Sequence, residues 1–145
     1  MAGYGVVTRS PAQIYAVVIG AVLVVAGIVG FFYSSAFGSP GQTDAVFGIL
    51  SVNGWHNVVH IATGAVGLVV AGHAARAYAG GLGLVYAAVA IWGFAIGSGQ
   101  SILGFLPVNG EDNVLHALIA LAGVAAYFTS SPRTAPGRAP SGATA

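Results

Sequence analysis

The chain has 145 residues, of which 57% are hydrophobic and only 5% are charged, and its formal net charge is +1. A soluble domain carries about 25% charged residues, so the composition excludes an ordinary water-soluble domain and predicts a protein of the lipid bilayer. The small net charge gives no reason to expect a nucleic-acid partner. The chain has no cysteine, which excludes disulfides, thiolate metal sites and a cysteine nucleophile.

Three regions are expected along the chain. Residues 1–10 form a flexible N-terminus, residues 11–130 form the helical domain, and residues 131–145 are rich in Pro, Ser, Thr, Gly and Ala, a composition typical of a disordered tail. The first apolar run is longer than the roughly 7–15 residues of a signal-peptide core. It is therefore interpreted as a membrane anchor rather than a cleaved signal.

Four apolar stretches are long enough to cross a bilayer, for which about 20 residues are needed. They lie at about residues 14–33, 55–75, 82–102 and 113–128. The predicted fold class is all-α: an integral membrane four-helix bundle.

The charged residues predict the orientation of this bundle. All arginines fall in the N-terminus, the second connection or the C-terminus, and all acidic residues fall in the first or third connection: Arg9, Arg76, Arg133 and Arg138 against Asp44, Glu111 and Asp112. Cytoplasmic loops carry the excess of positive charge. Both termini are therefore expected in the cytoplasm.

A repeat divides the chain. Residues 48–60 align without a gap on residues 104–116, each residue lying 56 positions before its counterpart. The predicted bundle thus consists of two tandem helical hairpins, at about residues 11–76 and 80–130, in a parallel repeat. Gly93 and Gly97 form a GxxxG pair, which permits close helix contact. The expected partner of the helices is the lipid bilayer. Close helix contact would also allow a homo-oligomer or an interaction with another membrane protein.

Four asparagines in the repeated motif form a candidate structural polar cluster. Asn53 and Asn109 stand just before a predicted helix, where Asn caps free N–H groups. Asn57 and Asn113 can bond to nearby backbone or across helices. The leading interpretation is that this cluster fixes helix packing.

The histidines leave alternatives open. His56 and His60 share a helix face because they are four residues apart, and Asp112 and His116 hold the equivalent positions. These four residues are a candidate metal site, since three imidazoles and a carboxylate suit zinc, iron or copper. His60 and His116 are alternatively candidate axial ligands of haem b. A small-solute or proton carrier is a third hypothesis.

The sequence contains no recognisable catalytic motif, such as a phosphate loop or His-Glu-x-x-His. We therefore expect a non-enzymatic protein. His73 stands apart from the repeat, near the cytoplasmic end of the second span, and is interpreted as an interfacial residue.

The segment from Phe47 to His60, with its His-Asn-x-x-His element followed by a Gly-rich span, resembles a bacterial, largely actinobacterial, family of small membrane proteins. This family is the domain of unknown function 4383. The resemblance covers roughly residues 10–130. It implies four spans and a location in the bacterial plasma membrane, and it implies no activity. Asp112 replaces the equivalent His56 in the second motif, so a strictly symmetric site is not expected.

Overall fold

The computed structural model describes residues 8–38 and 43–131. Four helices and two small sheets follow one another along the chain: α1 (Pro11–Phe31), β1 (Asp44–Val46), β2 (Leu50–Val52), α2 (Gly54–Val70), α3 (Ala75–Ile96), β3 (Gln100–Ile102), β4 (Leu106–Val108) and α4 (Gly110–Thr129). The predicted number of helices is confirmed and the chain is mostly helical, but it also contains two small sheets that the all-α prediction did not include. Most of the N-terminus and tail that were expected to be flexible, residues 1–7 and 132–145, lie outside the described residues.

The two connections that were expected to be plain loops each contain a β-hairpin. β1 pairs with β2 and β3 pairs with β4, both antiparallel, over three residues in each strand. Their turns place Phe47 and Leu103 at φ of 54° and 53°, each followed by a glycine that also has positive φ. Such turns favour Asn-Gly because left-handed backbone is strained for other residues. Because the turns contain Phe-Gly and Leu-Gly instead of Asn-Gly, the sequence contains no turn signal that predicts these hairpins.

The third helix begins and ends earlier than predicted. It runs from Ala75 to Ile96 instead of residues 82–102. Gly97 and Gly99 have φ of 85° and 79°, a conformation that ends a helix because it is left-handed. The residues after them, Gln100 to Ile102, pair as β3. The second helix is also shorter than predicted and ends at Val70, before the turn at residues 71–74.

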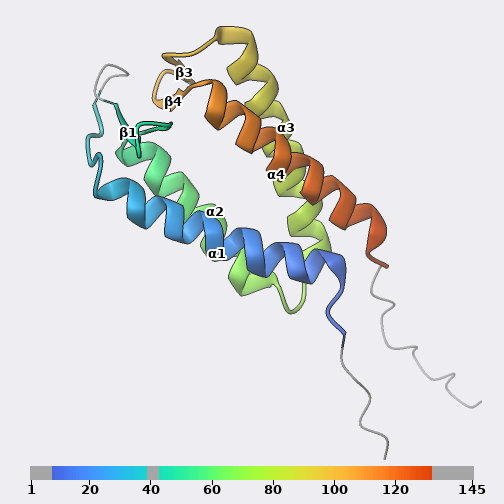
Figure 1. Ribbon diagram of the computed structural model, residues 1–145. Coiled ribbons are helices and arrows are strands. Elements are labelled where there is room, and N and C mark those ends of the chain that lie inside the picture. Colours follow the sequence, from blue (N-terminus) through green and yellow to red (C-terminus); the bar gives the residue numbers. More distant parts are fainter. Residues whose placement is uncertain (1–7, 39–42, 132–145) are drawn as a thin grey trace, which may run out of the picture.

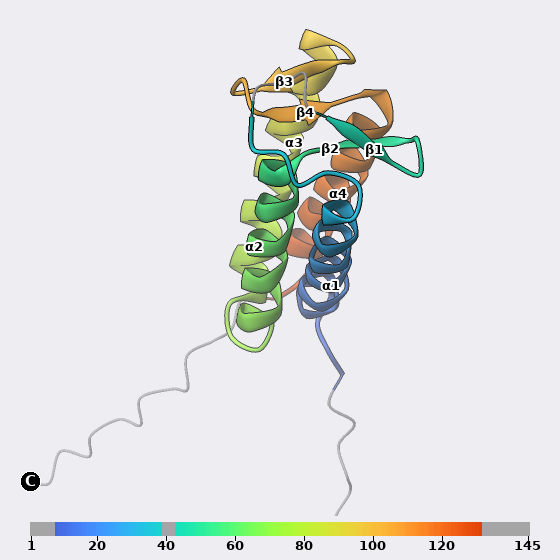
Figure 2. The same ribbon diagram turned by 90° about the vertical axis from the view of Figure 1, so that its left-hand side faces the viewer.

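The helices form two pairs. α1 packs mainly against α2, α3 packs mainly against α4, and α1 also contacts both helices of the second pair. Both β-hairpins lie at one end of the bundle, which we call the β end (Figures 1 and 2). The start of α1, the α2–α3 turn at residues 71–74 and the end of α4 lie at the other, which we call the turn end.

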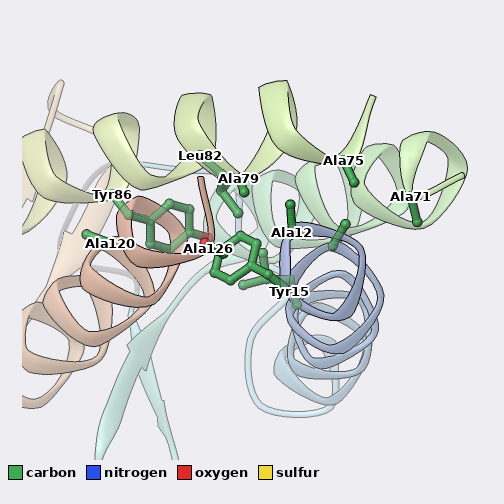
Figure 3. Close-up of a cluster of buried hydrophobic side chains, with 11 residues drawn as sticks. Ala12, Tyr15, Ala71, Ala75, Ala79, Leu82, Tyr86, Ala120 and Ala126 are labelled. Atoms are coloured by element: carbon green, nitrogen blue, oxygen red, sulfur yellow. The ribbon is translucent and has the colours of Figure 1, made fainter. Parts of the chain in front are cut away.

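Small residues line the contacts between helices. A side chain at Gly20 would meet the backbone of Gly64, and one at Gly83 would meet the backbone of α4. Inside the bundle, alanines lie around the buried rings of Tyr15 and Tyr86 (Figure 3). The Tyr15 hydroxyl donates a hydrogen bond to the carbonyl of Ile119 on α4 at 3.0 Å. The core of the helix bundle thus consists of Gly and Ala contacts, two tyrosines, and the leucines Leu23 and Leu82.

The large apolar side chains face outward instead. Residues on all four helices illustrate this, with exposed fractions of 41–76%: Val22, Leu68, Val69, Leu84, Ile91, Leu121 and Phe128. A water-soluble bundle would bury such residues and expose charges. Three helices, α1, α3 and α4, are long and apolar enough to cross a membrane, and α2 is shorter, with 17 residues.

The GxxxG pair does not act as one packing motif. Gly93 packs against Asn113 on α4, whereas a side chain at Gly97 would meet nothing within 4 Å. Gly97 instead ends α3 in a left-handed conformation. The two glycines therefore have different roles, and the expected close contact involves Gly93 alone.

Candidate functional site

The repeated motifs place two asparagines at the starts of α2 and α4, beneath the β-hairpins. The Asn53 side-chain oxygen accepts a hydrogen bond from the His56 backbone N–H at 2.9 Å. The Asn109 oxygen accepts one from the Asp112 N–H at 2.8 Å. Each asparagine thus satisfies a backbone donor that the first turn of a helix leaves free.

The side-chain amides of the same asparagines reach into the opposite half of the molecule. Asn53 Nδ2 donates to the carbonyl of Phe105, in the β3–β4 turn, at 2.7 Å. Asn109 Nδ2 donates to the carbonyl of Ile49, in the β1–β2 turn, at 2.5 Å. We call this exchanged pair of hydrogen bonds, made by Asn53 and Asn109, the polar clasp. It joins the two β-hairpins, which lie side by side at the β end (Figure 2).

Ser51 connects His56 and Asp112. The backbone N–H of Ser51 donates to the Asp112 carboxylate at 3.0 Å, and the Ser51 carbonyl lies 2.9 Å from Nδ1 of His56. Asp112 also accepts a hydrogen bond from the Asn109 N–H, at 3.2 Å. The carboxylate therefore serves the cap of α4 and the contact to β2.

Asn57 and Asn113 lie one turn deeper, each against a glycine of the partner helix. Gly30 on α1 faces Asn57 and Gly93 on α3 faces Asn113, and a Cβ atom at either glycine would overlap the amide oxygen. Asn57 Nδ2 donates to the carbonyl of Ser34 at 2.8 Å. The side-chain oxygens of both asparagines are buried without a hydrogen-bond partner among the described residues.

Three histidines meet between the halves. The rings of His56, His60 and His116 each offer a nitrogen, and these three atoms lie within 4.8 Å of one another. His56 and His116 are only 4% and 6% exposed. The sequence predicted that His56 and His60 share a face, and it left open whether His60 and His116 meet. The structure brings them together.

Asp112 does not belong to this group. Among the described residues, the group that could hold a metal ion consists of the three histidines alone. The Asp112 carboxylate is turned toward Ser51 and Asn109 instead. Of the four candidate ligands predicted from sequence, three therefore converge and one is engaged elsewhere.

The same geometry disfavours haem. Axial ligation would place a porphyrin between His60 and His116. The ligand nitrogen of His56 lies within 4.8 Å of the nitrogens of both, so its imidazole occupies the space that the macrocycle needs. The residues present fit a single ion better than a haem.

His73 lies away from this site, exposed in the turn after α2. Sequence reasoning missed the role of Ser51 and of the carbonyls of Ile49 and Phe105. The only signal for them was their position inside the duplicated motif, since a backbone carbonyl carries no side-chain signature.

The comparisons agree with the resemblance seen in the motif. No curated protein and no solved structure matches the chain. A family model, described as domain of unknown function DUF4383, matches residues 13–129. The chain therefore belongs to the DUF4383 family.

Proposed function

We propose that the chain is a small, non-enzymatic integral membrane protein of the bacterial plasma membrane. In this proposal the polar clasp holds its two helical hairpins together on the extracytoplasmic side. The observation that supports this role of the clasp is a pair of hydrogen bonds between the halves, one from Asn53 to the carbonyl of Phe105 and one from Asn109 to the carbonyl of Ile49. Each half supplies both a donor and an acceptor to the other.

The outer surface of the helices supports membrane insertion. Leu84, Ile91 and Phe128 are 70–76% exposed, and the helix contacts are lined by Gly and Ala. This distribution is typical of helices in lipid, where small residues permit close packing and large apolar residues face the acyl chains. The lipid bilayer is accordingly the partner that this surface fits best.

The charges support the orientation. Arg9 and Arg76 lie at the turn end, whereas Asp44, Glu111 and Asp112 lie at the β end. The positive-inside rule places the turn end in the cytoplasm. Both termini would then be cytoplasmic, and the polar clasp would lie near the outer surface of the membrane.

The clasp can be tested without disturbing the helix caps. Serine accepts the same capping hydrogen bond as asparagine but has no amide to donate across the interface. We expect the double variant Asn53→Ser/Asn109→Ser to keep its helices and to lose about 1 kcal/mol of stability per lost hydrogen bond. Thermal unfolding in mild detergent measures this loss. The variant Asn53→Ala/Asn109→Ala, which removes both cap and clasp, should lose more.

A second measurement reports the position of the hairpins directly. The chain has no native cysteine, so spin labels can be placed at Thr43 and Gln100, both exposed at the β end. The distance distribution between these labels should broaden in the serine double variant. An unchanged melting temperature together with an unchanged distance distribution would show that the clasp does not hold the halves together.

A further inference from the structure

The three converging imidazoles have a chemistry that the polar clasp does not use. The closest pair of nitrogens is His56 Nε2 and His60 Nε2, at 3.1 Å. Nδ1 of His56 faces a carbonyl oxygen, which can only accept, so this nitrogen carries the proton. Nε2 of His56 is then unprotonated and directs its lone pair toward His60. A metal-binding histidine is held in this way, with its other nitrogen donating to a carbonyl.

His116 completes the group from the other half. Its Nδ1 atom is buried, and no hydrogen bond to it occurs among the described residues. Its ring stands edge-on to that of Tyr86, with ring centres 5.1 Å apart. A buried nitrogen without a partner costs stability, so His116 brings into the group an imidazole whose Nδ1 is not committed to a hydrogen bond among the described residues.

The spacing of the rings fits one small ion. Two imidazoles bound tetrahedrally to the same zinc ion have nitrogens about 3.3 Å apart and ring centres about 5 Å apart. The nitrogens of His56 and His60 are 3.1 Å apart. The three ring-centre distances are 4.4, 6.0 and 6.4 Å, values that lie on both sides of the expected one. The widest pair, His60 and His116, would have to close from 6.4 Å to about 5 Å, a change of about 1.4 Å, to complete the geometry.

We propose that His56, His60 and His116 bind a divalent transition-metal ion of the Zn²⁺ or Co²⁺ type. Three neutral imidazoles without a thiolate or carboxylate suit these ions. The described residues supply no fourth ligand of the His or carboxylate kind. One coordination position is therefore left for water or an external ligand, and of the three residues His60 alone is partly exposed.

The histidine site and the polar clasp join the same two halves, and they meet at Asn53, whose side chain makes a clasp bond and also accepts the His56 backbone N–H. His56 and His60 are on α2 and His116 is on α4. These two helices have little backbone contact with each other. A bound ion would link them directly, one turn below the clasp.

The test uses untagged protein in mild detergent, stripped with a chelator and titrated with Zn²⁺. His73→Ala is the matched control, because His73 is the fourth histidine of the chain and lies in the exposed turn after α2. We expect wild type and His73→Ala to bind one equivalent of Zn²⁺ and to melt at a higher temperature with the ion present. His60→Ala and His116→Ala should lose affinity by more than the roughly 10–100-fold that loss of an outer partner of a ligand costs.

Co²⁺ supplies a spectroscopic readout. A four-coordinate site should give the intense visible absorption of tetrahedral Co²⁺, and both histidine variants should lose it. If an alanine variant does not fold, His60→Asn and His116→Asn keep a polar side chain without the imidazole. Folded wild-type protein that binds neither ion, or ligand variants that bind as well as His73→Ala, would overturn the proposal. A porphyrin absorption band in protein as isolated would also overturn it, in favour of haem.

Discussion

At the scale of single residues, the deepest polar contacts depend on glycine. Gly30 and Gly93 leave the space into which the amides of Asn57 and Asn113 fit. The asparagines are themselves almost completely buried, at 0% and 1% exposure. A single methyl group at either glycine must therefore displace a buried polar side chain.

This contact gives the first residue-scale prediction. We expect Gly30→Ala and Gly93→Ala each to lower the stability by about 1–3 kcal/mol, the usual cost of overpacking. Thermal unfolding in detergent measures the effect. Gly81→Ala is the matched control, because Gly81 is also helical and a side chain there would meet nothing within 4 Å. The control should be neutral or gain up to about 1 kcal/mol of helix propensity. Equal effects at all three positions would contradict the packing argument.

Individual residues also show which parts of the site could be predicted from the sequence. The capping role of Asn53 and Asn109 follows from their type and their position before an apolar run. Their second partners do not, because the amide of each reaches a backbone carbonyl about fifty or sixty residues away. The meeting of His60 with His116 likewise depends on how two helices of different halves are rotated. One sequence without tertiary contacts contains no information on that rotation.

At the scale of elements, the boundaries of the helices depended on turns rather than on hydropathy. The predicted third span included Gln100 to Ile102, which form β3. The left-handed conformations of Gly97 and Gly99 end α3 before them. Hydropathy averaged over a span does not register the backbone conformation of a glycine, which explains why the count of helices was right and this boundary was wrong.

The start of α3 and the end of α4 are joined by one arginine, which gives an element-scale prediction. The Arg76 guanidinium lies 3.9 Å from the centre of the Tyr127 ring, and its Nε donates to the Tyr127 carbonyl at 3.1 Å. We expect Arg76→Ala to lower the stability by about 1–2 kcal/mol. Thermal unfolding measures this loss.

Arg76→Lys tests the cause of that effect. Lysine keeps the charge but lacks the planar guanidinium that stacks on the ring and donates through Nε, so it should recover only a small part of the stability. Arg9→Ala removes a charge from the same end at an exposed position and should change the melting temperature little. Full recovery by lysine would assign the effect to charge alone.

At the scale of the whole molecule, the distribution of side chains is the reverse of that in a soluble bundle. Glycine and alanine fill the contacts, while valine, leucine, isoleucine and phenylalanine cover the outside. Apart from Ser130, the buried polar side chains lie toward the β end, and the arginines of the described residues lie at the turn end. The two ends of the bundle therefore differ in charge and in buried polar groups, as expected for a protein whose ends face opposite sides of a membrane.

The orientation across the membrane can be decided with single cysteines, since the chain has none of its own. Thr43→Cys places a thiol at the β end and His73→Cys places one at the turn end, both at exposed positions. On intact cells we expect a membrane-impermeant maleimide to label Thr43→Cys at once, and to label His73→Cys only after the cells are permeabilised. The expectation rests on the arginines at the turn end, which the positive-inside rule places in the cytoplasm. The opposite pattern would invert the topology and move the histidine site to the cytoplasmic side. Labelling of both thiols on intact cells would contradict a protein whose two ends are separated by the membrane.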